Sequence, residues 1–358
     1  MNRLNALRAR LADLRVPAAL VTDPLDIAWL SGFRGSNGAL LVTAEDHWVV
    51  TDFRYRTQVG LEAPAWAPVF QDTGESLHAA IGRLAAGLHL DELACQANHL
   101  TWQAARRLGE LLGDVDLVPH NDVLGDLRSI KSAAEIERIG AAATLADQVI
   151  AHVPHVARIG RTEREVRVGL ETFMLEIGSE GTAFDIIVGG GPNSAMCHAK
   201  PGPRPLAAGD LLVIDLGCVV NGYHSDITRT FALGHAEDQA QAIYSVVYDA
   251  LQAGLAAVAP GRAGQAVDSA ARDLISARGH GPDFGHGLGH GVGLEIHENP
   301  RLGPSSTDTL QTGQIVTVEP GVYVEGYGGV RLEQLCLVTA DGVDVLSHAP
   351  CPPDVPVI

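Results

Sequence analysis

An internal repeat constrains the fold of this chain more than any other feature of its sequence. Residues 206–223 align with residues 310–327 without a gap, and six of the eighteen aligned pairs are identical. Both copies combine a strongly apolar run with a glycine-rich hairpin, and Asp215 in the first copy falls on Glu319 in the second. Chance similarity between two hairpins would not align these acids. The repeat predicts a pseudo-twofold domain whose two β-hairpins each present carboxylates toward the middle.

Each copy of the repeat is followed by a second acid, Asp226 after the first and Glu333 after the second. Asp215 and Glu319 each end an apolar run, where an unpaired charge would be costly. Four carboxylates that face one another raise one another's pKa strongly unless a cation lies among them. A bound metal is the simplest interpretation of the four acids. Solvation or salt bridging of these acids is the alternative.

Glycine occupies every other position from Gly285 to Gly293. This pattern excludes a helix and predicts an extended segment that approaches its neighbour closely, with His286, Leu288, His290 and Val292 on its other side. At about 3.3 Å per residue, the two histidines would be roughly 13 Å apart, too far for both to bind one metal centre. We expect His290 to be a ligand. For His198, His286 and His297, a role in the site and an ordinary packed or surface position both remain open.

Several classes of function are excluded by what the sequence lacks. It has no H-E-x-x-H helix, no G-x-S-x-G turn and no phosphate-binding P-loop, so the corresponding hydrolase and nucleotide mechanisms lack their parts. The chain carries 25 basic and 43 acidic residues, a net charge of −18, which argues against nucleic acid and anionic membranes as partners. Five cysteines without a C-x-x-C pair predict a reducing compartment. Without a signal peptide or an apolar span, we expect a cytoplasmic protein.

The length of 358 residues predicts two domains, at about 150 residues per domain. The first, residues 1–125, is interpreted as a small α/β domain, and residues 126–358 form the second. In the first domain we expect a helix from Leu4 and a strand at 18–22. We then expect, between Trp29 and Asp52, a strand, a turn at Asn37-Gly38 and two further strands. In the second domain, helices are predicted at about 132–152, 162–178, 237–258 and 264–278.

Together these segments resemble the pita-bread metallopeptidases, the family of methionine aminopeptidase, aminopeptidase P and prolidase. The resemblance covers residues 130–345 and rests on Ile214–Gly217, Tyr223–Phe231, His286–Glu298, Val318–Tyr323 and Gly329–Glu333. It implies an α+β fold with a pseudo-twofold catalytic domain and a site for two metal ions per chain. The ligands that it implies are Asp215, Asp226, His290, Glu319 and Glu333. The oxygen-rich set favours Mn²⁺, with Co²⁺ or Zn²⁺ as alternatives.

The first domain resembles the creatinase-like N-terminal domain of the prolyl members, through Phe33–Gly38 and Thr51–Tyr55. Methionine aminopeptidases generally lack this domain, and creatinases do not keep the metal ligands. Both features together imply a peptidase that hydrolyses Xaa-Pro dipeptides or proline-containing peptides, and a homodimer. The alternatives are an aminopeptidase P acting on longer Xaa-Pro peptides, an aminopeptidase without a proline requirement, and an inactive pita-bread domain that binds peptides or histones.

The resemblance also implies roles for individual residues. A hydroxide that bridges the two metal ions would be the nucleophile, and Glu319 would accept its proton as well as bind metal. His198 and His297 would stabilise the tetrahedral intermediate, and His286 would line the proline pocket. Arg331 either braces a ligand carboxylate or meets the substrate's C-terminal carboxylate. The segment Trp29–Asn37, with Arg34, either reaches the partner's active site or contributes core residues to its own domain.

Overall fold

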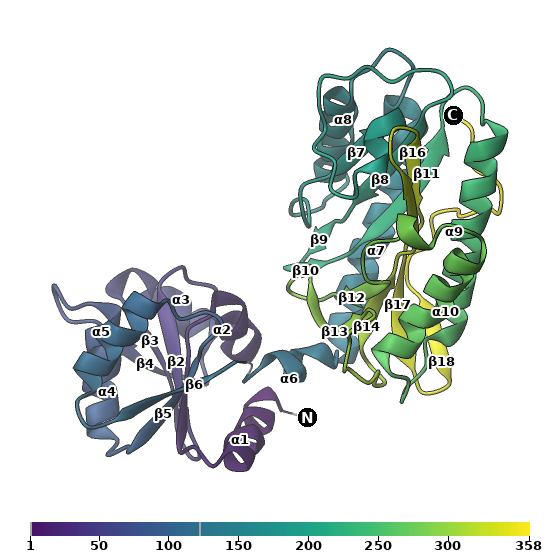
Figure 1. Ribbon diagram of the computed structural model, residues 1–358. Helices are drawn as coiled ribbons and strands as arrows, with labels where there is room; N and C mark the ends of the chain where they lie inside the picture. Colours follow the sequence, from purple (N-terminus) through teal and green to yellow (C-terminus); the bar gives the residue numbers. More distant parts are fainter. Residues whose placement is uncertain (1, 122) are drawn as a thin grey trace. The chain divides into compact units, whose positions relative to one another are not determined.

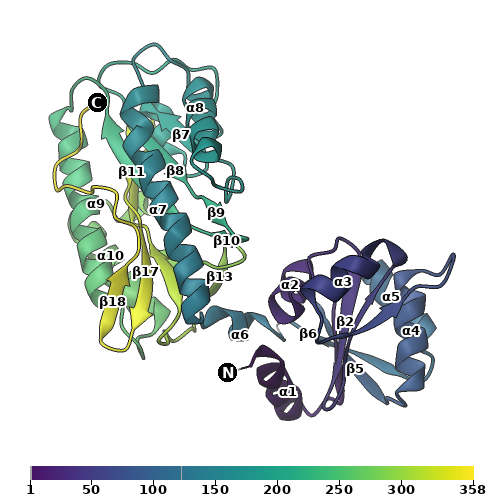
Figure 2. The ribbon, with the colours of Figure 1, turned by 180° about the vertical axis from the view of Figure 1, so that it is seen from behind.

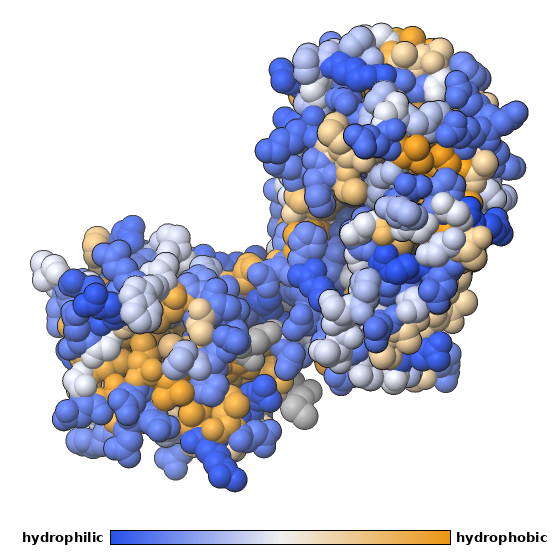
Figure 3. Space-filling view, viewed as in Figure 1, coloured by the Kyte–Doolittle hydropathy of each residue, from blue (hydrophilic) through white to orange (hydrophobic). Residues whose placement is uncertain are grey.

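The computed structural model describes residues 2–121 and 123–358 and divides the chain into two compact units. The first unit ends at Leu127 and the second begins at Arg128. Hydrophilic residues cover most of the face shown in Figure 3, with apolar patches on both units. Each unit has its own hydrophobic core and is described separately.

The first unit is a six-stranded mixed sheet with helices packed against it (Figure 1). The strand order is β4-β3-β2-β1-β5-β6, in which β1, β2 and β3 pair antiparallel and the outer strands pair parallel. The strands are β1 (Ala18–Val21), β2 (Gly38–Thr43), β3 (His47–Thr51), β4 (Ala67–Phe70), β5 (Glu92–Gln96) and β6 (Asp116–His120). The helices are α1 (Arg3–Leu14), α2 (Pro24–Ser31), η1 (Phe53–Tyr55), α3 (Arg56–Glu62), α4 (Leu77–Gly87) and α5 (Trp102–Leu112). The predicted first helix and first strand are confirmed.

The predicted strand before Asn37-Gly38 is wrong, because the chain from Pro24 forms helix α2. The Asp23 side chain accepts a hydrogen bond from the backbone N–H of Leu25 and caps the helix, which ends at Gly32 with φ of 89°. These are standard start and stop signals for a helix. They outweigh the strand preference of the apolar residues between them.

The hairpin turn also lies elsewhere than predicted. Strand β2 begins at Gly38 itself, and the turn connects Thr43 to Asp46, whose backbone groups and Thr43 hydroxyl bond to one another. The Asn37 side chain instead donates a hydrogen bond to Asp52 at 2.6 Å. Asn37 therefore links the start of β2 to the end of β3 and takes no part in the hairpin turn.

The second unit contains two similar halves, each with a pair of helices outside a sheet (Figures 1 and 2). In the first half β8 pairs with β11 and with β7, and in the second β14 pairs with β17 and with β12. A short hairpin interrupts each main pair, β9–β10 in the first and β15–β16 in the second. The predicted pseudo-twofold repeat is thus present in the strand topology.

All four helices predicted in the second unit are found. They are α7 (Ala133–Val156), α8 (Glu163–Glu176), α9 (Asp238–Ala257) and α10 (Gly264–Ala277), preceded by α6 (Gly125–Ser129) at the unit boundary. The first-half strands are β7 (Ile187–Gly190), β8 (Leu211–Leu216), β9 (Val219–Val220), β10 (Tyr223–His224) and β11 (Ile227–Ala232). The second-half strands are β12 (Gly289–Gly291), β13 (Glu298–Leu302), β14 (Ile315–Val318), β15 (Gly321–Val324), β16 (Gly328–Arg331), β17 (Gln334–Thr339) and β18 (Gly342–Val345). Two short turns of 3₁₀ helix, η2 (Gly191–Ala195) and η3 (Gly281–Asp283), precede segments that line the site.

Candidate metal centre

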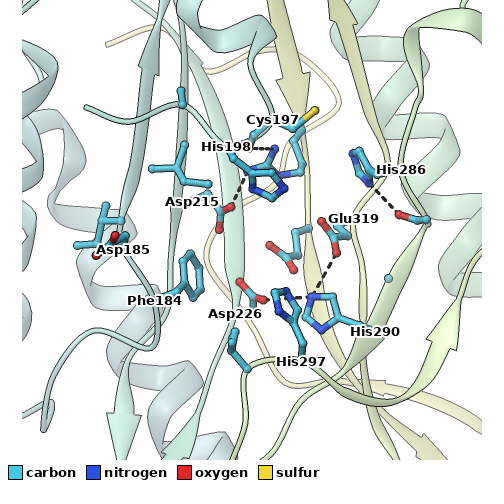
Figure 4. A pocket seen from close by; sticks show the side chains of 18 of the residues that line it. Phe184, Asp185, Cys197, His198, Asp215, Asp226, His286, His290, His297 and Glu319 are labelled. Carbon is cyan, nitrogen blue, oxygen red and sulfur yellow. Dashed lines mark hydrogen bonds and ion pairs between the residues drawn. The ribbon is translucent and has the colours of Figure 1, made fainter. Parts of the chain in front are cut away.

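The four repeated acids lie at equivalent places in the two halves of the second unit. Asp215 is in β8, directly opposite Thr228 of β11, and Asp226 comes just before β11. Glu319 follows β14, and Glu333 precedes β17, which pairs with β14. The pairing of the two strands in each half therefore brings its two acids to one end, where they face the same cavity (Figure 4).

Three of the predicted ligands form a group that could hold a metal ion. One side-chain atom each of Asp226, His290 and Glu333 lies within 4.8 Å of the other two, and all three residues are buried. His290 Nε2 is 3.5 Å from Asp226 Oδ2 and 3.3 Å from Glu319 Oε1. Asp215 lines the same cavity. The five expected ligands therefore line one cavity.

The chemistry of these carboxylates fits a cation. Burial, followed by repulsion from the other acids, raises the pKa of Asp226 and of Glu333 well above ordinary values. Asp215 Oδ1 and Glu333 Oε1 are buried and accept no hydrogen bond from any described residue. Buried oxygens of this kind are costly unless a partner satisfies them. Divalent ions that prefer carboxylate oxygen would be such partners.

The position of His290 depends on the glycines beside it. A Cβ atom at Gly289 would lie 2.0 Å from the Thr317 carbonyl oxygen, and one at Gly291 would lie 2.2 Å from the Asn299 carbonyl oxygen. The close backbone approach predicted for this segment is thus present. His290 Nδ1 donates to the Gly291 carbonyl oxygen at 3.0 Å, which leaves Nε2 free to bind a metal.

The alternation predicted for the whole glycine-rich segment holds only in part. Regular strand is confined to Gly289–Gly291, with an irregularity in its pairing after His290. His286 and His290 line the cavity, whereas Leu288 and Val292 are fully buried in hydrophobic clusters. A break in regular pairing turns alternate residues in different directions, and the sequence does not reveal where such a break occurs.

The cavity has a volume of about 780 Å³ and is lined by all nine residues expected in the site. His297 lies against His290, with ring centroids 4.4 Å apart. Partial burial, and then the neighbouring His290, lowers the pKa of His297 to about 4, so this ring is neutral at pH 7. His198 lines the wall formed by the segment after η2, beside Cys197 (Figure 4).

Arg331 contacts a predicted ligand directly. Its Nη2 lies 2.5 Å from Asp215 Oδ2, and its Nε donates to the Thr228 hydroxyl at 3.1 Å. The same hydroxyl donates to Glu333 Oε2 at 2.8 Å. Arg331 is only 3% exposed. Of the two roles left open by the sequence, this geometry favours bracing of a ligand carboxylate.

Tyr323 is a site residue that sequence reasoning missed. Its hydroxyl accepts a hydrogen bond from Arg331 Nη1 at 2.9 Å and lies 2.9 Å from His286 Nε2. His286 Nδ1 donates to the Gly287 carbonyl oxygen at 2.8 Å, so Nε2 accepts from the tyrosine. Tyr323 lies four residues after Glu319 in the repeat, which was the one signal available for it.

Comparison with known proteins identifies the family. The sequence model of metallopeptidase family M24 matches residues 137–340, and the model of the creatinase/prolidase N-terminal domain matches residues 3–130. The chain belongs to metallopeptidase family M24. It is therefore a hydrolase of a family that uses divalent metal ions, and the α+β architecture expected from the sequence is confirmed.

Similar proteins extend over nearly the whole chain. An uncharacterised peptidase of Bacillus subtilis is 34% identical over 97% of this chain and 98% of its own length. The Xaa-Pro dipeptidase of Pyrococcus furiosus is 41% identical over 63% of this chain and 65% of its own. The structure of an Xaa-Pro dipeptidase from Bacillus anthracis has a TM-score of 0.96 at 33% identity and covers 99% of both chains. An X-Pro aminopeptidase structure from Thermotoga maritima has a TM-score of 0.89 at 30% identity and covers 98% of this chain and 100% of its own.

Two further features concern the helices and the cysteines. Among the described residues, no helix combines the length and the apolar character needed to cross a bilayer. The five cysteines, at positions 95, 197, 218, 336 and 351, are all free thiols.

Proposed function

We propose that this protein is an Xaa-Pro dipeptidase with two divalent metal ions in each chain. The observation that carries the proposal is the convergence of three buried carboxylates, the partly buried Glu319 carboxylate and one imidazole on a single cavity. The proposed ligands are Asp215, Asp226, His290, Glu319 and Glu333. When bound, the ions supply a hydroxide nucleophile near neutral pH and polarise the scissile carbonyl.

Mn²⁺ is the metal that we propose, because four of the five ligands are carboxylates and only one is an imidazole. Oxygen-rich sets suit Mn²⁺, whereas Zn²⁺ and Co²⁺ also accept sites richer in nitrogen. Elemental analysis of the purified protein tests both number and identity. Two ions per chain are expected, and fewer than one per chain after dialysis against Mn²⁺ would contradict the proposal.

Glu319 is the proposed proton acceptor. Burial alone would raise the pKa of Glu319, but the cations that it would hold favour its charged form. The carboxylate is therefore ionised at neutral pH and can take a proton from the nucleophilic water. It then passes that proton to the leaving prolyl nitrogen.

The three histidines outside the proposed ligand set contact the substrate in this proposal. His198 and His297 donate hydrogen bonds to the oxygen that becomes negative in the tetrahedral intermediate. Both are exposed to the cavity, and the neutral His297 ring carries one N–H donor. His286 lines the pocket for the proline ring, beside Tyr323. Xaa-Pro specificity is supported because this protein is similar to Xaa-Pro dipeptidases both in sequence and in structure.

The second candidate is an aminopeptidase P that acts on longer Xaa-Pro peptides. The structural similarity to an X-Pro aminopeptidase favours it. Hydrolysis of Ala-Pro, Ala-Pro-Gly and Ala-Ala by one batch of the Mn²⁺-loaded protein separates the possibilities. We expect Ala-Pro to be cleaved fastest. Faster cleavage of Ala-Pro-Gly would replace the dipeptidase by the aminopeptidase, and faster cleavage of Ala-Ala would remove the proline requirement.

Two substitutions make this assay specific to the site. Glu319→Gln removes the proposed proton acceptor and should abolish hydrolysis of all three peptides. Glu325→Gln makes the same chemical change at the exposed tip of the β15–β16 hairpin and should leave hydrolysis unchanged. Equal activity of the two variants would exclude Glu319 from the reaction.

We also propose that the protein is a cytoplasmic homodimer. The five free thiols fit a reducing compartment. Trp29 and Phe33 are core residues of the first unit, 6% and 0% exposed, whereas Arg34 is exposed. Of these three side chains, Arg34 is therefore the one available to a partner. Light scattering should give twice the mass of the 37.6 kDa chain, and a monomer would refute the dimer.

Subunit exchange tests Arg34 itself. Two inactive or weakened proteins, Asp226→Asn and Arg34→Ala, are mixed and allowed to exchange subunits. If Arg34 acts across the dimer, hybrids recover activity because one site has both an intact metal centre and an intact partner segment. If exchange occurs without recovery, Arg34 has no role in the partner's site.

A further inference from the structure

His286 lies on a segment that has no regular secondary structure to fix it. Phe284–Leu288 connects η3 to β12, and glycines stand on both sides of the histidine, at Gly285 and Gly287. Glycine adopts many backbone conformations, so such a segment loses more entropy on ordering than an ordinary one. Something outside the segment must therefore hold His286 in the cavity.

An ion pair on helix α10 contacts this backbone on both sides of the histidine. Arg272 donates from Nη1 to the Phe284 carbonyl oxygen at 2.9 Å and from Nη2 to the His286 carbonyl oxygen at 2.6 Å. Asp268 Oδ1 accepts from the backbone N–H of Leu288 at 3.0 Å. The pair thus bonds to the backbone of His286 itself and to the backbone of the residues two positions before and two positions after it, Phe284 and Leu288.

The two charged residues are themselves rigidly joined. Arg272 Nε and Nη2 donate to the two oxygens of Asp268 at 2.7 and 2.8 Å, in the planar fork geometry of a bidentate pair. Asp268 is fully buried. The Arg272 guanidinium also lies 4.2 Å from the centroid of the Phe284 ring, whose centroid is 5.0 Å from that of His286.

The His286 ring is held by two residues next to the metal site, Tyr323 and, through it, Arg331. His286 Nε2 accepts from the Tyr323 hydroxyl, which also bonds to Arg331. Neither Asp268 nor Arg272 lines the cavity. A buried ion pair adds little net stability compared with an apolar pair of the same volume. Stability alone therefore does not explain why this pair directs its remaining polar atoms at the backbone around His286.

We propose that Asp268 and Arg272 are positioning residues that hold His286 in the orientation needed for catalysis. The inference rests on the proposed function, in which His286 contacts the proline of the substrate. It assigns a role to a part of α10 that lies outside the metal site. The pair acts through the backbone, so its effect on turnover must depend on the presence of the His286 ring.

Arg272→Lys is the first test. Lysine keeps a positive charge opposite the buried Asp268 carboxylate but loses the planar fork that reaches four oxygens at once. We expect kcat for Ala-Pro to fall about tenfold while the metal content stays at the wild-type level. Arg278→Lys is the matched control, because Arg278 follows the same helix and forms an exposed pair with Asp249 at 3.1 Å. It should leave kcat unchanged.

A double-mutant cycle separates positioning from general destabilisation. In the His286→Ala background, Arg272→Lys should cause no further loss of kcat, because the ring that it positions is absent. An equal loss in both backgrounds would overturn the proposal. If Arg272→Lys does not fold, Asp268→Leu with Arg272→Met removes both charges together, avoids an unpaired buried charge, and should show the same dependence on His286.

A measurement without catalysis distinguishes failure of this inference from failure of the proposed function. In protein labelled with ¹⁵N-histidine and loaded with diamagnetic Zn²⁺, the His286 signal is the one that disappears in His286→Ala. Arg272→Lys should shift or broaden that signal, and Arg278→Lys should leave it unchanged. If the wild-type protein cleaves no Xaa-Pro peptide, the proposed function fails. This spectrum still tests whether Asp268 and Arg272 position His286. If the His286 signal is unchanged in Arg272→Lys, the positioning role of Arg272 is refuted.

Discussion

Replacement of Glu333 by glutamine tests the metal centre through stability rather than activity. Glutamine has the same shape, and its amide oxygen can still accept the hydrogen bond that the Thr228 hydroxyl donates at 2.8 Å. The change removes one of the buried charges, at a residue only 2% exposed. It also replaces the Oε1 atom that has no partner among the described residues. Folding contacts are kept while a proposed metal ligand is lost.

The expected shift follows from ligand linkage. A metal held at 1,000 times its Kd stabilises the folded state by about 4 kcal/mol. The second unit spans Arg128–Ile358, a size at which 1 kcal/mol moves Tm by about 2–4 °C. Removal of one such ion should therefore lower the Tm of the wild-type unit by roughly 8–16 °C, and chelation of both ions should lower it further. In chelator, Glu333→Gln should melt at or above the wild-type temperature, because one repelling carboxylate is gone.

Calorimetric melting with buffered Mn²⁺ and with chelator measures both effects. Glu333→Gln should gain at most a small part of the wild-type stabilisation by Mn²⁺, and Glu325→Gln should behave as the wild type does. If Glu333→Gln gained the full wild-type shift, Glu333 would not be a ligand. If chelator left the wild-type Tm unchanged, the four carboxylates would not be sharing metal ions.

Other substitutions probe the substrate contacts and one ion pair of the first unit. Alanine at His198 or His297 should leave metal content near normal but lower kcat by about 10²-fold, as for loss of a transition-state donor. Alanine at His286 should also leave metal content near normal and should lower kcat through loss of a contact with the proline ring; elemental analysis and steady-state kinetics check all three variants. Tyr323→Phe should lower kcat with unchanged metal content, and loss of metal would instead give it a role in the metal centre. Hydrogen bonding to Arg54 lowers the pKa of Asp52, so its contribution to stability is present at neutral pH and lost as pH falls below about 4. Acid unfolding of Asp52→Asn should depend less on pH in that range, and an unchanged dependence would contradict this assignment.

The sequence predicts that the four acids of the proposed metal centre lie together, because they come from a repeat. Asp215 and Glu319 occupy the same position in two copies of one strand-and-hairpin pattern. Antiparallel pairing of β8 with β11 and of β14 with β17 then brings the second acids beside the first. The long helices are equally predictable, since their apolar periodicity extends over three turns or more.

The parts that the sequence does not predict depend on contacts between distant segments. Nothing local to Asp268 and Arg272 indicates that they reach the backbone around His286. Helix α2 is a different case, because its start and stop signals, Asp23, Pro24 and Gly32, are present in the sequence. The apolar residues between them favour a strand when composition alone is considered. Cap residues are more informative than apolar composition in such a short segment.

The break in the repeat explains how equivalent acids acquire different roles. The second copy has three more residues between its Gly-Tyr pair and its second acid. These residues belong to the stretch that contains β16, whose last residue, Arg331, reaches back to Asp215 of the first copy. Asp215 is therefore fixed by a buried guanidinium. Its counterpart Glu319 forms no ion pair with an arginine among the described residues and lies beside His290 instead. A carboxylate that is not held in a bidentate or charged pair keeps an oxygen for proton transfer, which supports Glu319 rather than Asp215 as the proton acceptor.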